Sequence, residues 1–233
     1  MKRVLVSMMA IIMAMPLAAC TSKTKTETPK AIIKSSGQKT DQAKKTDTIK
    51  KRNDILIAYF TVPETDGVDT VSGASRVATK DGVQGNTEFI ANEIQKNLGG
   101  DLFEIKTVKK YPGTHDPLLE DAYKEKSDDA RPKLATKIEN LDQYDYIFIG
   151  YPNWNSDLPM PLYTFLEQYD FSGKTIIPFV THGGSGFSDT IETIKELEPK
   201  ADVVESGLSI SRDDVADAQD EVKTWTNALL KDE

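Results

Sequence analysis

The sequence predicts an α/β fold: a doubly wound, five-stranded parallel sheet with helices on both faces. Two observations predict it. From residue 54 onward, short apolar runs alternate with segments whose apolar residues recur every three or four positions. The apolar runs are nearly continuous, as expected for strands that are covered on both faces. Strands and helices that alternate in this way indicate one folded domain, residues 54–233, with no internal repeat.

The first twenty residues have the pattern of a secretory signal peptide. Lys2 and Arg3 precede an apolar stretch at 4–17 that is too short to span a membrane comfortably. The sequence Leu-Ala-Ala-Cys, which ends at Cys20, resembles a bacterial lipobox. That resemblance implies cleavage before Cys20 and a diacylglyceryl thioether on its sulfur, so that two acyl chains hold the protein on a membrane. An uncleaved signal anchor or an ordinary secreted protein is the alternative.

The charge of the chain changes sign along its length. Residues 1–20 carry a net charge of +2, residues 21–53 carry +7, and residues 54–233 carry −17. The middle segment is poor in large apolar side chains, so we expect a disordered basic tether. Its charge favours an anionic membrane surface, although a merely soluble spacer is equally consistent with it. The acidic domain is not expected to bind nucleic acid.

Cys20 is the only cysteine of the chain. Once it is acylated, the domain has no thiol for a disulfide, a redox reaction or a thiolate metal site. Any electron chemistry therefore has to come from a bound cofactor.

The first half of the domain is predicted to hold two strands, at 55–60 and 102–105. Between them, Asn86 can cap a helix that ends at Gly99 and Gly100. A more polar helical region is expected at 118–126, with a possible continuation at 134–138. The apolar face of the first helix consists of Phe89, Ile90, Ile94 and Leu98.

The second half is predicted to hold strands at 146–149, 175–180 and 203–210. Pro178 is unusual for a central strand because proline has no N–H to donate. A helix is expected at 161–169 and another around Ile191, Ile194 and Leu197. The last helix has its apolar face at three- and four-residue spacing, namely Val215, Ala218, Val222, Trp225 and Leu229.

Ligands of open parallel sheets bind beyond the carboxyl ends of the strands, where the strand order reverses. After the first strand, Thr61 and a Gly- and Asp-rich insertion at 62–84 lead to Gly85, Asn86 and Thr87 at a helix start. The free amides of a helix N-terminus suit a phosphate, and threonine hydroxyls can add donors. An ordinary helix cap is the alternative interpretation.

Two further loops carry candidate ligand residues. The loop after the third strand contains a tryptophan, which offers a flat face to a planar ring or packs on its own loop. The loop after the fourth strand has three glycines in four residues, which let a ligand approach the backbone closely. The candidates are Pro152, Asn153, Trp154 and Asn155 in the first of these loops, and Thr181, His182, Gly183, Gly184, Ser185, Gly186 and Phe187 in the second.

Hydrolysis and metal binding are both disfavoured. The nucleophile-elbow motif of serine hydrolases requires a glycine where Phe187 stands. His182 has no second histidine or carboxylate at ligand spacing, and the other histidine, His115, lies in a polar segment.

The motifs together resemble those of bacterial flavodoxins, in particular the branch with a long insertion between the first strand and the first helix. The resemblance rests on residues 55–61, 85–87, 150–154 and 181–186, continues through 165–167 and 171–176, and covers about residues 54–230. It implies the strand order 2-1-3-4-5 and one non-covalent FMN. By the same resemblance, Thr61 and residues 85–87 hold the phosphate, residues 152–155 flank the flavin ring with Trp154 stacked or edge-on, and the amides of residues 181–187 contact its polar edge.

Two departures from the flavodoxin pattern bear on ring stacking. Asn155 and Ser156 stand where the family often has Trp and Gly, and Phe187-Ser188 replaces an aliphatic residue followed by Gly. In the insertion, residues 72–76 are a candidate cover for the phosphate, with Arg76 as its charge partner, or else a solvated loop.

The function that the resemblance implies is electron transfer by a lipid-anchored, extracytoplasmic flavodoxin with unidentified redox donors and acceptors. The acidic domain disfavours extra negative charge on the reduced flavin, so we expect a low potential. Two alternatives stay open: an FMN-dependent NAD(P)H or quinone reductase, and a lipoprotein that binds flavin without redox duty.

Overall fold

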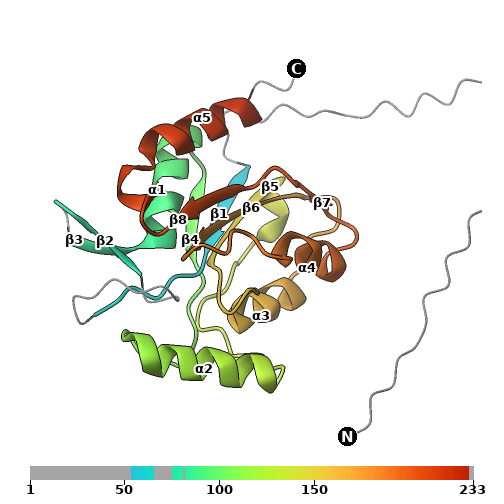
Figure 1. Ribbon diagram of the computed structural model, residues 1–233. Coiled ribbons are helices and arrows are strands. Elements are labelled where there is room, and N and C mark those ends of the chain that lie inside the picture. Colours follow the sequence, from blue (N-terminus) through green and yellow to red (C-terminus); the bar gives the residue numbers. More distant parts are fainter. Residues whose placement is uncertain (1–53, 66–74, 81, 231–233) are drawn as a thin grey trace, which may run out of the picture. The chain divides into compact units, whose positions relative to one another are not determined.

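A computed structural model describes residues 54–65, 75–80 and 82–230 (Figure 1). The predicted signal peptide, Cys20 and the tether at 21–53 lie outside the described residues. The main sheet is parallel, with the order β4-β1-β5-β6-β7, and β8 also pairs with β6. Its strands are β1 (Ile55–Tyr59), β4 (Asp101–Glu104), β5 (Tyr146–Pro152), β6 (Thr175–His182), β7 (Asp202–Val203) and β8 (Leu208–Ser211). The predicted order 2-1-3-4-5 is confirmed.

The fifth strand is divided, whereas the sequence predicted one strand over 203–210. β7 pairs with the start of β6 and β8 pairs with its end, so that Pro178 lies between the two paired stretches. The carbonyl of Ile176 accepts the Val204 N–H at 2.9 Å. Alternate residues of a strand present their backbone groups to the same side, so Pro178 faces the fifth strand as well, and it has no N–H to offer. The ladder breaks at that point.

Five helices within the described residues cover the two faces of the sheet (Figure 1). Helices α1 (Asn86–Leu98) and α5 (Gln219–Leu229) pack on one face. Helices α2 (His115–Ser127), α3 (Met160–Gln168) and α4 (Thr190–Leu197) lie on the other side. β1 feeds both cores, because its alternate side chains point to opposite faces. Ile55, Ile57 and Tyr59 join the α1 and α5 side, and Leu56 and Ala58 join the other.

Residues 134–138 are not helical, so that part of the prediction is wrong. Leu134 forms an antiparallel bridge with Thr107, and the Ala135 N–H donates to the Lys106 carbonyl at 2.6 Å. Buried Ile138 donates its N–H to the Tyr169 hydroxyl at 2.8 Å. The apolar residues of this segment therefore reach the core from an extended chain whose backbone groups are paired with neighbouring loops.

The structure also contains three further elements that the sequence did not predict. The insertion contains an antiparallel hairpin of β2 (Arg76–Thr79) and β3 (Gly82–Gly85). Val215 and Ala218 lie in and just after a 3₁₀ turn (Val215–Asp217) that precedes α5, rather than within the last helix. A second 3₁₀ turn covers Leu141–Gln143. Among the described residues, no helix combines the length and apolar character that a membrane crossing requires.

Candidate functional site

The carboxyl ends of β1, β5, β6 and β8 meet at a polar pocket beside the N-terminus of α1. This is the point at which the strand order reverses, because β4 and β5 lie on opposite sides of β1. Seven of the predicted site residues line the pocket, and two others, Ser75 and Arg212, complete it. The predicted seven are Thr61, Asn86, Thr87, Pro152, Asn153, Thr181 and His182.

The helix end of this pocket has an unsatisfied polar side chain. Asn86 is the first residue of α1 and is only 3% exposed. Neither its Nδ2 nor its Oδ1 has a hydrogen-bond partner among the described residues. A buried amide without a partner costs about 1–3 kcal/mol. The adjacent amides of the α1 N-terminus also favour an anion, so a bound phosphate could accept a hydrogen bond from Nδ2 and offset the donor's part of this cost.

Close backbone packing places Thr61 and Thr87 at the same helix start. A Cβ on Gly85 would overlap the Thr61 side chain, so a glycine is required there. The Gly85 N–H donates to the Glu88 carboxylate at 3.3 Å, which orients the first turn of α1. The Thr87 and Thr181 hydroxyls lie 2.8 Å apart and connect this turn to the end of β6.

Asn153 connects the two loops that were predicted to hold a ring. Its backbone N–H donates to the Thr181 carbonyl at 2.9 Å, and its Nδ2 donates to the Gly186 carbonyl at 2.8 Å. Nδ2 also lies 3.1 Å from the Ser188 hydroxyl, which accepts from it. Its Oδ1 is buried with no hydrogen-bond partner in the described part of the chain. The loops after β5 and β6 therefore lie side by side, with an acceptor still available between them.

Trp154 lies in the core in this conformation. It is 4% exposed and makes edge contacts with Phe60 at 5.3 Å and Tyr111 at 5.4 Å between ring centroids. Its Nε1 is buried and has no partner among the residues described. Trp154 therefore packs on its surroundings here, and stacking on a flavin ring would require it to move.

Tyr111, which packs against Trp154, is fixed by a buried carboxylate. Its hydroxyl donates to Glu125 of α2 at 2.6 Å, and Lys109 donates to the same carboxylate at 2.8 Å. Burial, followed by the neighbouring Glu125, raises the pKa of Tyr111 well above its usual value. Tyr111, which packs against Trp154 in the loop after β5, is thus held in place by α2.

Residues 154–157 form a tight turn. Trp154 and Asp157 exchange backbone hydrogen bonds at 3.1 and 3.0 Å, and the two central residues, Asn155 and Ser156, have φ values of 56° and 59°. Lys126 of α2 donates to the Asn155 carbonyl at 3.1 Å and pairs with Asp157 at 2.9 Å. The flavodoxin resemblance expects glycine at 156, and the left-handed backbone at that position fits this pattern.

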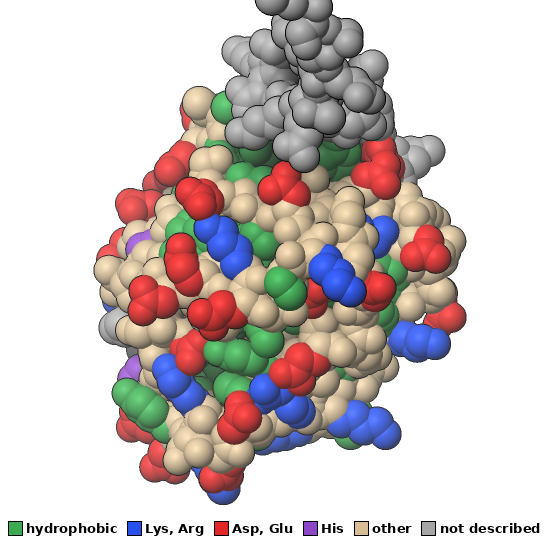
Figure 2. Space-filling model, turned by 90° about the vertical axis from the view of Figure 1, so that its right-hand side faces the viewer, with side chains coloured by type: hydrophobic (Ala, Val, Ile, Leu, Met, Phe, Trp, Pro, Cys, Tyr) green, Lys and Arg blue, Asp and Glu red, His purple; other side chains and the backbone are tan. Residues whose placement is uncertain are grey.

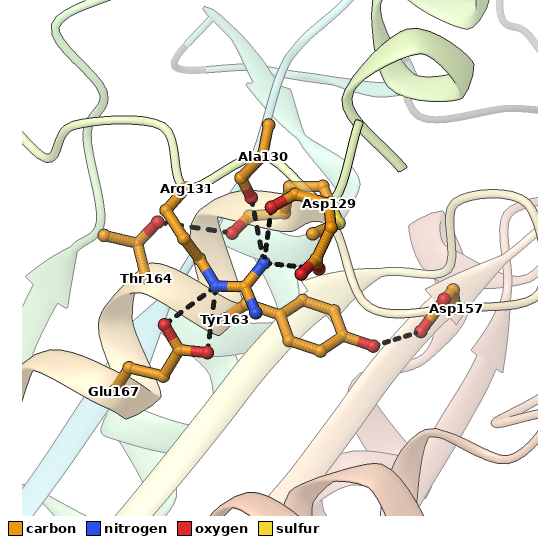
Figure 3. A network of polar contacts seen from close by, with 8 residues as sticks. Asp129, Ala130, Arg131, Asp157, Tyr163, Thr164 and Glu167 are labelled. Atoms are coloured by element: carbon orange, nitrogen blue, oxygen red, sulfur yellow. Dashed lines mark hydrogen bonds and ion pairs between the residues drawn. The ribbon is translucent and has the colours of Figure 1, made fainter. Parts of the chain in front are cut away.

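A polar network fixes the same turn to α3 (Figure 3). Tyr163 of α3 donates its hydroxyl to Asp157 at 2.9 Å. Arg131 stands over the Tyr163 ring, 5.0 Å from its centroid, and its Nε donates to both oxygens of Glu167 at 2.9 and 2.7 Å. The network gives the turn a defined position beside the pocket.

The loop after β6 is the most open part of the site. Gly183, Gly184 and Ser185 are exposed, and Gly186 and Phe187 are partly buried. The Gly184 N–H donates to His182 Nδ1 at 3.0 Å. Burial lowers the pKa of His182, while the neighbouring Asp214 acts in the opposite direction. The neutral imidazole thus orders the start of the glycine-rich loop.

Several predicted contributors lie differently from the expectation. Arg76 forms an ion pair with Glu64 at 2.5 Å, the Glu64 carboxylate being fully buried, and Arg76 is not among the residues that line the pocket. Trp154, Asn155 and residues 183–187 also lie outside the pocket lining. Arg212 was missed by the sequence reasoning. It directly follows β8, so a survey of the residue after every strand would have found it.

An open parallel sheet with a ligand pocket at the reversal of strand order defines the class of doubly wound α/β proteins whose site lies at the switch point. Within this class, a family model described as "Flavodoxin" matches residues 76–229 of this chain. The chain therefore belongs to the flavodoxin family.

Individual relatives agree with this assignment. A flavodoxin from Haemophilus influenzae is 27% identical over 133 residues, which are 52% of this chain and 60% of that protein. A flavodoxin from Picosynechococcus is 32% identical over 114 residues, 46% of this chain and 52% of that protein. The chain thus matches less than two thirds of the length of these curated relatives.

Solved structures share the fold. A protein from Bacteroides uniformis that is classed as a flavoprotein superposes with a TM-score of 0.56 at 29% identity, covering 75% of this chain and 98% of that one. A flavoprotein from Lactobacillus acidophilus in complex with FMN gives a TM-score of 0.52 at 18% identity, covering 72% of this chain and 99% of that one.

Proposed function

We propose that this chain is an FMN-binding electron carrier that a lipid on Cys20 holds at the extracytoplasmic face of a membrane. The observation that carries the cofactor proposal is the buried Asn86 amide, which has no hydrogen-bond partner in the described residues, at the N-terminus of α1. Family membership supports it, as does the polar pocket at the switch point.

The residues present fit the phosphate end of FMN. Thr61, Asn86 and Thr87 offer donors around the helix N-terminus, where backbone amides favour an anion. Asn153 holds the loops after β5 and β6 together, so that the ring's polar edge would meet an ordered backbone. When bound, FMN supplies the one- and two-electron chemistry, and the protein supplies binding, orientation and electrostatics.

The acidic surface is the basis for a low potential. Asp and Glu side chains are spread over the face shown in Figure 2, interspersed with Lys and Arg. Residues 54–233 carry a net charge of −17. This charge disfavours additional negative charge on the bound flavin, and we expect a potential below that of free FMN. A potential above that of free FMN, measured by spectroelectrochemistry, would contradict this expectation.

Membrane anchoring rests on the sequence around Cys20. We expect metabolic labelling with a fatty-acid analogue to mark the wild-type chain but not Cys20→Ser, and the variant to leave the membrane fraction. Equal labelling of both chains, or unlabelled wild type, would contradict lipidation at Cys20. The electron donors and acceptors of the carrier stay unassigned.

The test of the electron-carrier function is a titration with FMN followed by anaerobic reduction. We expect a perturbed flavin absorbance spectrum at one equivalent, reversible reduction and reoxidation, and no steady turnover of NAD(P)H. Steady NAD(P)H oxidation in the presence of a quinone would indicate a reductase instead. A bound flavin that does not cycle would indicate a binding lipoprotein without redox duty.

A further inference from the structure

One cationic side chain lines the pocket at the α1 N-terminus in the described residues. Arg212 directly follows β8, and its side chain is 22% exposed. It shares the pocket lining with Asn86, Thr87 and His182. Its backbone N–H donates to the His182 carbonyl at 2.7 Å, which fixes the start of its chain segment to the end of β6.

The other titratable groups near this pocket do not provide positive charge. Burial keeps the pKa of His182 below its ordinary value, so its imidazole is neutral at pH 7. Arg76 is engaged by the buried carboxylate of Glu64. Asp213, whose carboxylate lies 3.6 Å from the Arg212 Nε, and Asp214, which acts on His182, are acidic. The Arg212 guanidinium would therefore offset part of the repulsion between a doubly charged anion in this pocket and the acidic domain.

Neutral donors and a cation contribute differently to the binding of a phosphate group. The helix amides and the Asn86 side chain bind phosphate oxygens by hydrogen bonds, whereas a guanidinium adds a charge-assisted, bidentate contact. A phosphate monoester carries about −1.5 to −2 charges at pH 7. The dephosphorylated ligand has a neutral hydroxyl group in this place, which carries no charge for the guanidinium to pair with. The pocket is therefore built to discriminate a phosphorylated ligand from its dephosphorylated form.

We propose that Arg212 binds the phosphate of FMN and makes this protein selective for FMN over riboflavin. This inference rests on the proposed function, because it assigns the specificity of the same site. In this proposal Arg212, and not Arg76 as the sequence suggested, is the charge partner of the phosphate.

The expected effect of the Arg212→Gln substitution is a loss of FMN affinity of about 10- to 100-fold, as for a hydrogen bond to a charged group. Riboflavin affinity is expected to change by less than about twofold, since riboflavin has no phosphate. The Arg212→Lys variant keeps the charge but loses the planar fork, and it is expected to fall between wild type and Arg212→Gln. Raised salt is expected to weaken FMN binding by wild type more than by Arg212→Gln.

The experiment titrates FMN and riboflavin into the full chain in detergent, following flavin fluorescence at two salt concentrations. Inorganic phosphate serves as a competitor of FMN. Lys137→Gln, which removes an exposed positive charge outside the pocket, is the matched control and should behave as wild type. Unchanged riboflavin affinity in the Arg212 variants also shows that they are folded.

The outcomes separate this inference from the proposed function. Selective loss of FMN affinity in Arg212→Gln supports the assignment. Equal affinities of wild type and Arg212→Gln for FMN, or an equal loss for FMN and riboflavin in the variant, would overturn it, while flavin binding by wild type would still support the proposed function. Wild type that binds neither flavin would overturn the proposed function itself.

Discussion

The hydroxyl groups of Thr87 and Thr181 lie 2.8 Å apart in the buried base of the candidate site. They come from the first turn of α1 and from β6, which are 94 residues apart in the chain. This single hydrogen bond joins the helix terminus expected to hold a phosphate to the loop expected to hold a ring. The order of the site therefore depends on tertiary pairing between two small polar side chains.

Replacing Thr181 by valine is expected to destabilise the protein by about 1–3 kcal/mol, because it leaves the buried Thr87 hydroxyl without this partner. The double variant Thr87→Val/Thr181→Val is expected to lose less than the sum of the single variants, because neither hydroxyl is then left behind. Urea unfolding measures both. Thr224→Val on the exposed side of α5 is the control. Strictly additive losses would contradict the coupling of the two hydroxyls.

Trp154→Ala is expected to cost about 3–5 kcal/mol of stability, because it removes the ring packed between Phe60 and Tyr111. Flavin affinity is expected to fall as well, by about 1–3 kcal/mol if the ring stacks on flavin as aromatic residues do on bases. Denaturation and FMN titration of the same sample measure the two effects.

Trp154→Phe separates the two roles of this residue. It retains an aromatic ring and removes the buried indole N–H, so its stability loss is expected to be smaller than that of Trp154→Ala. An unchanged FMN affinity in both variants would remove Trp154 from the flavin site and leave it a purely structural residue.

Ser156→Gly is expected to stabilise the protein by about 0.5–1 kcal/mol, because Ser156 has a φ of 59° and glycine adopts this conformation without steric cost. Thermal unfolding measures the change. Ser206→Gly is the control: Ser206 is not among the described residues with positive φ, so glycine there should destabilise. Destabilisation by Ser156→Gly would show that the serine side chain itself supports the turn.

Glu198 is expected to make stability depend on pH. Burial, with repulsion from Asp170 as a second cause, raises its pKa from 4.5 to about 7. The folded state therefore binds this proton more tightly than the unfolded state does, and stability is lost as pH rises from about 4.5 to about 7. Glu198→Gln is expected to be more stable than wild type at pH 8 and similar to it at pH 4.5.

Urea unfolding at these two pH values checks the expectation. The control is Glu196→Gln, an exposed residue in the last turn of α4, which ends just before Glu198. The gain at pH 8 is expected to be at most about 1 kcal/mol, since solvent screens a group near the surface. A Glu198→Gln variant no more stable than wild type at pH 8 would contradict the raised pKa.

The sheet and most of the pocket could be predicted from the sequence, because both follow from short-range patterns. The apolar run at 55–60 is buried on both faces as expected. The start of α1 was predicted to within one residue: Gly85 is the N-cap, and Asn86, the predicted cap, is the first helical residue and makes no side-chain hydrogen bond in the described part of the chain. The rule that ligands bind beyond the carboxyl ends of parallel strands then selected Thr61, Thr87 and Thr181.

What could not be predicted depends on tertiary pairing. Residues 134–138 have helical spacing, yet the chain is extended there: residues 133–135 pair with residues 106–108, and Ile138 donates its N–H to the Tyr169 hydroxyl. The fifth strand is divided opposite Pro178, because the backbone of Pro178 faces this strand and has no N–H to donate. The partner of Arg76 and the place of Arg212 in the pocket also depend on contacts between distant segments.

The most direct test of the account is the titration of the full chain with FMN, compared with the Asn86→Ala variant. Wild type is expected to saturate at one equivalent with a shifted flavin spectrum. The variant is expected to bind FMN more weakly, because it lacks the Asn86 amide N–H that would donate to the phosphate. A flavin spectrum that stays that of free FMN at every protein concentration would contradict FMN binding. Wild-type FMN affinity in Asn86→Ala would contradict the role of the Asn86 amide.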